Sequence, residues 1–129
     1  MDIQKFRVLV EEALEQIPNR FLTLMDNVVV MVEDETRAEE GAEVGIRRGP
    51  TLLGLYQGVP RTQRGPNYSL VLPDKITIFK TPIEALGQTP EGIRELVRDT
   101  VWHEVAHHFG MNDERIRVAE KRRKRMTQR

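Results

Sequence analysis

The most informative stretch of this sequence reads HEVAHHFGMND and runs from His103 to Asp113. His103 and His107 stand four residues apart, and on an α-helix this spacing places two side chains on one face, about 6 Å apart along the axis. Two imidazoles arranged in this way can bind one metal ion, and Glu104 lies beside them. The stretch therefore predicts a metal site with a carboxylate placed to accept a proton from water.

The residues upstream favour the helix that this spacing requires. Thr89 is a good N-cap, Pro90 suits the first helical position, and Glu91 places an acid in the first turn. Apolar residues then recur at helical spacing, and no proline interrupts the segment before Phe109. We therefore expect a helix from about Pro90 to Phe109.

A glycine after this helix predicts a sharp turn. Gly110 can adopt the left-handed conformation that ends a helix, which would return Asp113 toward the face that carries His103 and His107. An ionised Asp113 would then be the third metal ligand. Asp113 could instead cap a following helix, or do both with its two oxygens, and Glu114 is the reserve ligand.

The longer pattern HExxHxxGxxD resembles that of the zincins, and within them the metzincin-like group, in which a third ligand follows a glycine turn. Most metzincins have a histidine where this sequence has Asp113. The wider sequence is similar to a family of very small bacterial zincin-like proteins, the minimal zincins. The segments that carry the similarity are Leu53–Tyr56, Gly58–Pro60, Leu72–Asp74, Ile76–Thr77 and His103–Arg115.

This resemblance covers most of the chain and implies a metallopeptidase that binds one zinc ion, Zn²⁺. His103, His107 and Asp113 would hold the ion and leave a fourth position for water, with Glu104 as the general base of peptide-bond hydrolysis. In zincins an edge strand pairs with an extended substrate, and the segments 51–56 or 68–72 are candidates for lining the cleft. Because the domain is small, we expect it to recognise only a short, extended peptide segment, and the resemblance does not specify the sequence of that peptide.

Two functions other than peptide hydrolysis are also compatible with the sequence. Larger metzincins carry a methionine-containing turn beneath the metal, and neither Met111 nor Met126 can be assigned that role. This difference favours a catalytically weak or inactive metal-binding interaction module. A basic C-terminal tail, about 120–129, suggests a regulator associated with nucleic acid. We do not favour nucleic acid as the partner, because no aromatic interleaving or known binding motif accompanies the charges. We favour a solvated, fraying helix end as the explanation of the tail.

Several side chains near the motif have structural alternatives. His108 points about 100° away from His107 on a helix, so we expect it to face solvent or to support a metal ligand from behind. We expect Trp102, Ala106 and Phe109 to belong to the core. Tyr56 is either a donor to a developing oxyanion or a packed structural residue.

Composition sets broad limits on the protein. Its 129 residues, 39% of them hydrophobic, suit one domain over 1–129. Cysteine is absent, which rules out disulfides and a thiolate metal site. We find no secretion signal in the sequence and no apolar run approaching the roughly 20 residues that span a bilayer, so we expect a cytoplasmic protein with no membrane contact.

The remaining pattern predicts an α+β, zincin-like fold with a small twisted mixed sheet packed on the HExxH helix, and with N-terminal and C-terminal helices. An amphipathic first helix begins at Ile3 and ends near Pro18, and a short helical segment follows around 21–25. The acidic stretch 33–50 looks like a long surface connection. The expected strands are Val28–Val32, Thr51–Tyr56, Tyr68–Leu72 and Lys75–Phe79.

Overall fold

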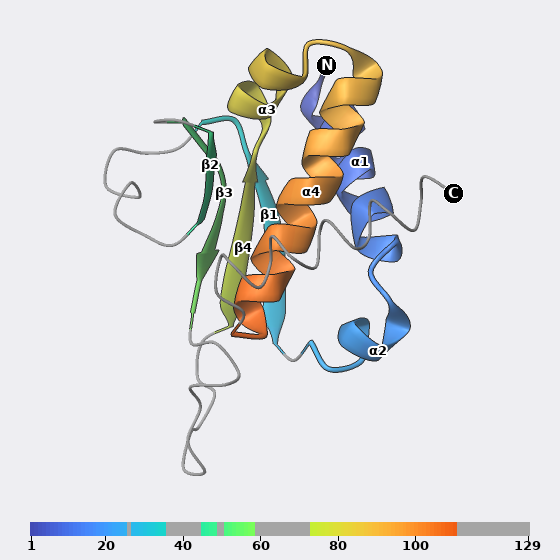
Figure 1. Ribbon diagram of the computed structural model, residues 1–129, viewed down its shortest axis with the longest axis vertical. Coiled ribbons are helices and arrows are strands. Elements are labelled where there is room, and N and C mark those ends of the chain that lie inside the picture. The colour runs from blue at the N-terminus through green and yellow to red at the C-terminus, as the bar shows by residue number, and fades with distance from the viewer. Residues whose placement is uncertain (26, 36–44, 49–50, 59–72, 111–129) are drawn as a thin grey trace.

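A computed structural model describes residues 1–25, 27–35, 45–48, 51–58 and 73–110 (Figure 1). Several sequence predictions lie outside these residues. They are the third ligand Asp113 and its reserve Glu114, the strand at 68–72, the terminal helix, the basic tail and most of the acidic connection.

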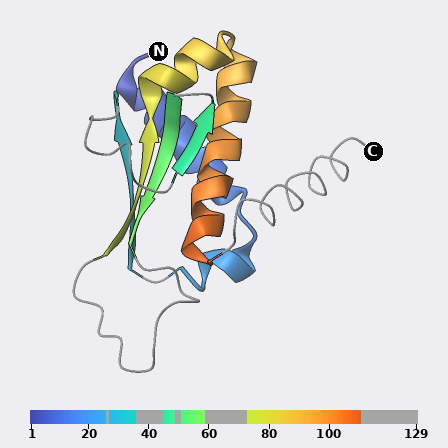
Figure 2. The ribbon, with the colours of Figure 1, turned by 60° about the vertical axis from the view of Figure 1, so that its left-hand side comes forward.

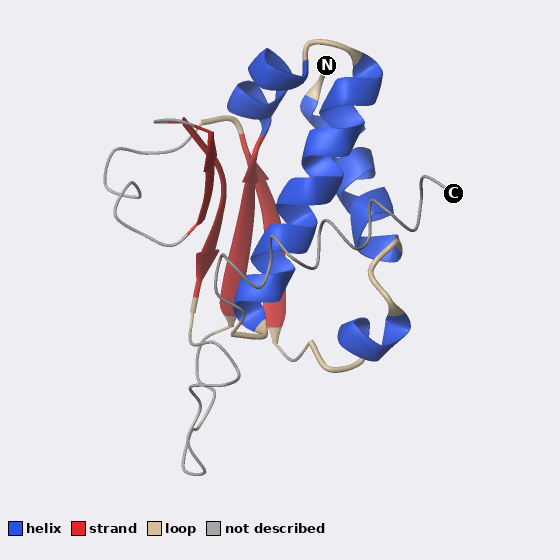
Figure 3. Cartoon of the chain, in the orientation of Figure 1, coloured by secondary structure: helices blue, strands red, loops and turns tan. Residues whose placement is uncertain are grey.

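Four helices appear in the described part of the chain. They are α1 (Ile3–Glu15), α2 (Asn19–Leu22), α3 (Lys80–Gly87) and α4 (Pro90–His108). The two long helices, α1 and α4, lie together on one face of the sheet (Figures 1 and 3). The sequence predicted α1 and α4 and placed α2 slightly too late, but it did not predict α3. Among the described residues, no helix combines the length and apolar character needed to cross a membrane.

The sheet has four described strands, in the order β1-β4-β3-β2. They are β1 (Val28–Glu33), β2 (Gly45–Arg48), β3 (Thr51–Gln57) and β4 (Asp74–Phe79). β1 runs parallel to β4, whereas β3 is antiparallel to both β4 and β2. The predicted α+β architecture with a mixed sheet is therefore confirmed. β2 corrects the expectation that 33–50 is only a surface connection.

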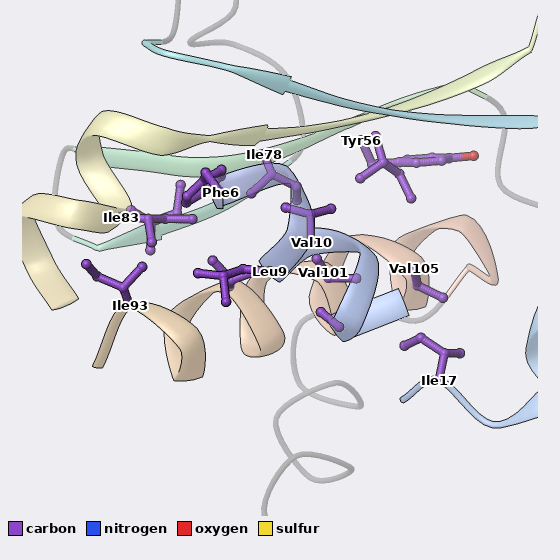
Figure 4. Packing of buried hydrophobic residues seen from close by; sticks show 14 residues of the cluster. Phe6, Leu9, Val10, Ile17, Tyr56, Ile78, Ile83, Ile93, Val101 and Val105 are labelled. Carbon is purple, nitrogen blue, oxygen red and sulfur yellow. The ribbon is translucent and has the colours of Figure 1, made fainter. Parts of the chain in front are cut away.

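The main core fills the space between the sheet and the pair α1 and α4, and Figure 4 shows part of it at close range. Its fully or nearly fully buried side chains include Phe6, Leu9, Val10, Leu53, Ile76, Ile78, Ile83, Val97, Val101 and Val105. Burying one side chain of this size stabilises the fold by about 1.5–3 kcal/mol relative to exposure. Contacts from several turns of α4 therefore fix this helix against the strands.

A β-bulge in β3 shapes the surface that meets α4. Between the pairs Ile46↔Gly54 and Arg47↔Leu52, β3 contains one residue more than β2, so Leu53 is the extra residue. Leu53 packs in the core beneath the helices, whereas Leu52 belongs to a separate small cluster with Leu55 and Phe79. The bulge thus interrupts the alternation of side chains between the two faces of β3, next to Gly54, where Thr100 and Glu104 of α4 lie close to the strand.

Candidate metal centre

The helix that carries the motif begins and ends as its sequence predicts. Thr89 Oγ1 accepts a hydrogen bond from the Gly92 N–H at 3.0 Å, and Pro90 occupies the first turn. At the other end, α4 stops at His108, one residue before the expected end. Gly110 follows with a φ of 80°, the left-handed conformation expected of it, and its N–H donates to the His107 carbonyl at 2.9 Å.

Three side chains of α4 converge at its C-terminal half. His103, Glu104 and His107 each offer one ligand atom, and these three atoms lie within 4.8 Å of one another. The two imidazole rings stand perpendicular, with centroids 4.6 Å apart. The structure therefore brings together the two predicted histidine ligands and the predicted base.

Burial and hydrogen bonding organise this cluster. Glu104 is fully buried and His107 is 7% exposed, whereas His103 is half-buried and forms the more open side. Glu104 Oε1 lies 2.9 Å from His107 Nδ1. Because a carboxylate accepts hydrogen bonds, this contact places the imidazole hydrogen on Nδ1 of neutral His107. The Nε2 atom of that tautomer carries the lone pair that a metal ion accepts.

The donor set fits a divalent transition-metal ion. Zinc in proteins is commonly bound by imidazole nitrogens, and His103 and His107 can supply two of these donors. Two imidazoles and one further ligand are the usual protein contribution to an open zinc site. The expected third ligand, Asp113, lies outside the described residues, and its ligand role stays a prediction.

A glycine of β3 lies directly against Glu104. A Cβ atom added to Gly54 would sit 2.6 Å from Cγ2 of Thr100 and 3.2 Å from Glu104 Oε2. Only a residue without a side chain leaves room for Glu104 between the sheet and the helix. An isolated glycine within a strand often marks such a close approach, and this signal was present in the sequence.

Behind the cluster, a second polar group connects α4 to the sheet. His108 is fully buried, and its Nδ1 lies 3.0 Å from Asp74 Oδ2. The hydroxyl of Tyr56 donates to the same carboxylate oxygen at 2.6 Å. Of the two expectations for His108, exposure to solvent is therefore wrong, and the alternative of a buried place behind a metal ligand stays open. Asp74 lies in a segment that carries the family similarity, but no role could be assigned to it from the sequence, because its partner is 34 residues away and only the folded chain brings the two together.

Three other side chains at the C-terminal end of α4 and just after it pack in or against the core, as expected. Ala106 is buried, and Trp102 and Phe109 are partly buried against the core. Both rings contact Phe21, with centroid separations of 6.0 and 5.5 Å. This aromatic group joins the segment containing α2 to the helix that carries the metal cluster.

Comparison with known protein families agrees with the site geometry. A family model described as zincin-like metallopeptidase matches residues 25–122. The match spans most of the chain and includes the whole HExxHxxGxxD pattern. The chain therefore belongs to the zincin-like metallopeptidase family. A comparison with curated proteins finds no match.

Proposed function

We propose that the protein is a zinc-dependent peptidase. The observation that carries this proposal is the convergence of His103, Glu104 and His107 in the C-terminal half of α4, in a chain of the zincin-like metallopeptidase family. The members of this cluster differ in accessibility, which suits a site that binds an ion inside the protein and receives a substrate from outside.

His103 and His107 would hold the ion through imidazole nitrogens, and Asp113 would complete the protein ligands after the Gly110 turn. When bound, zinc lowers the pKa of a water molecule toward about 7 and polarises the carbonyl that is attacked. Thr89 and Pro90 contribute indirectly, because they fix the start of the helix that positions both histidines.

Glu104 would act as the proton carrier. As water oxygen bonds to the carbonyl carbon of the peptide, Glu104 accepts the proton that the water loses. It then donates this proton to the amide nitrogen as the carbon–nitrogen bond breaks, which releases a neutral amine and a carboxylic acid. The hydrogen bond to His107 Nδ1 holds one Glu104 oxygen, and the contact with Gly54 limits where the other can move.

The substrate would bind along β2 rather than β3. β3 is paired on both sides, by β2 and β4, so it cannot receive a further strand. β2 lies at one edge of the described sheet and contacts α4 (Figure 2). An extended peptide that adds to β2 would lie beside the metal helix, with backbone hydrogen bonds supplying affinity without a strong demand on side chains.

A peptide library tests the proposed function. The purified protein should cleave at least some peptides with zinc bound, lose this activity after treatment with a chelator, and regain it when zinc is restored. The His103→Ala/His107→Ala variant, purified in the same way, controls for contaminating proteases. Zinc binding without cleavage of any peptide would contradict the peptidase and indicate a metal-binding interaction module.

A further inference from the structure

We propose that Asp74 and His108 form a positioning unit that fixes the orientation of His107. This inference rests on the proposed metal site, because His107 matters as a ligand of that site. Asp74 and His108 are not among the proposed metal ligands. They act through the last turn of α4.

The unit joins three elements in a space closed to solvent. Asp74 begins β4 and is 1% exposed, His108 ends α4 and is fully buried, and Tyr56 of β3 is 5% exposed. Asp74 Oδ2 receives hydrogen bonds from both partners, at 3.0 Å from His108 and 2.6 Å from Tyr56. The rings of Tyr56 and His108 meet edge to face, with centroids 6.0 Å apart.

Gly58 packs closely against the carboxyl group of Asp74. A Cβ atom at Gly58 would collide with the Asp74 carboxyl group, and the φ of 155° at this glycine is one that other residues rarely adopt. The carboxylate therefore has a fixed place, against which His108 is oriented.

The cost of this arrangement indicates a role beyond filling space. Burying a carboxylate is unfavourable unless hydrogen bonds compensate for the lost water, and apolar residues of similar volume fill such a space at less cost. A hydrogen bond differs from an apolar contact in being directional. The bond between His108 and Asp74 thus opposes rotation of the last helical turn about its axis, which apolar packing would resist less strongly.

His107 shares that turn. Consecutive helical residues are rotated by about 100°, so fixing His108 toward the sheet also fixes the direction in which His107 leaves the helix. The hydrogen bond between His107 and Glu104 then sets the ring orientation. Gly110 adopts its left-handed conformation two residues after His108, so the same unit also fixes where this turn begins.

A pair of substitutions at one position separates hydrogen bonding from charge. Asp74→Asn removes the charge but keeps an oxygen that accepts the two hydrogen bonds, whereas Asp74→Leu removes both charge and acceptor at similar size. Val97→Ala is the control, because it removes buried methyl groups from the same helix away from the unit. All variants are studied as full-length protein, below their measured unfolding temperatures.

The first measurement is zinc affinity by competition with a chelating indicator. Outer contacts that orient metal ligands typically change affinity 10- to 100-fold, and we expect about a tenfold loss for Asp74→Leu because His108 acts through its neighbour. Asp74→Asn and Val97→Ala should bind zinc like the unmodified protein. Unchanged affinity in folded Asp74→Leu, or an equal loss in Val97→Ala, would overturn the proposal.

The second measurement needs no metal. Nitrogen–hydrogen correlation spectra of the histidine side chains in metal-free protein should show one tautomer for His107, as the bond to Glu104 requires, and a mixture in Asp74→Leu. If the unmodified protein binds no zinc, the proposed function fails, and this spectrum still decides whether Asp74 orients His107. Should Asp74→Leu not fold, Asp74→Leu/His108→Leu replaces both polar partners, and an unaltered His107 spectrum in it would refute the proposal.

Discussion

Gly54 of β3 packs directly against Glu104 of α4, and the glutamate side chain fits there because Gly54 has no side chain of its own. A methyl group at position 54 would approach Glu104 Oε2 to 3.2 Å and Thr100 Cγ2 to 2.6 Å. The strand therefore limits the positions available to the proposed general base. A bulge at Leu53 lies directly beside this contact.

Gly54→Ala should destabilise the protein and displace Glu104. We expect a loss of about 1–3 kcal/mol in the free energy of unfolding, the usual cost of overpacking a core, measured by denaturant titration. Adding Thr100→Ser removes the methyl group nearest to the new Cβ and should restore most of this stability. Peptidase activity should remain low in the double variant because Glu104 is still crowded. Full activity in Gly54→Ala would show that the contact does not constrain Glu104.

The ligand assignment predicts a distinct pattern of metal loss. Zinc-loaded protein should contain about one ion per chain, and His103→Ala or His107→Ala should nearly abolish binding because too few protein ligands remain. Metal content after dialysis against a weak chelator measures this directly.

The third ligand is tested by a neighbouring pair of carboxylates. Asp113→Ala should weaken zinc binding substantially, whereas Glu114→Ala, its matched control, should leave it unchanged. The reverse pattern would assign the third ligand to Glu114.

The turn after α4 should be sensitive to the residue at position 110. Gly110 has a φ of 80°, and a residue with a Cβ pays about 1–2 kcal/mol in the left-handed region. Gly110→Ala should therefore lower stability and also weaken zinc binding, since the turn directs the chain toward Asp113. Gly110→Asn should be milder in both measurements because asparagine tolerates this conformation better. Equal effects of alanine and asparagine would argue against a strained turn as the cause.

Local signals made the metal helix predictable from sequence. Thr89, Pro90 and Gly110 act within a few residues of the helix ends, and His103 and His107 are related by helical spacing alone. The α+β architecture was predictable for the same reason, because most of the strands are marked by short local runs of β-branched and apolar residues.

Features that depend on distant pairing were harder to predict. β2 is four residues long and is defined by hydrogen bonding to β3, so its own sequence carries little strand signal. Asp74 resembles any polar residue at the start of a strand until the fold places His108 and Tyr56 beside it. For His108 the sequence left two alternatives, solvent or a place behind a metal ligand, because helical geometry gives the direction of the side chain but not what lies there.

Glu104→Gln tests the central claim, zinc-assisted hydrolysis with Glu104 as the base, most directly. The substitution keeps the size of the side chain and removes no proposed ligand, so the variant should retain its fold and its zinc. Its kcat on a peptide that the unmodified protein cleaves in a chelator-sensitive manner should fall by about 10²- to 10⁴-fold, the usual contribution of general-base catalysis. Cleavage at the unmodified rate, with equal zinc content, would contradict the role of Glu104.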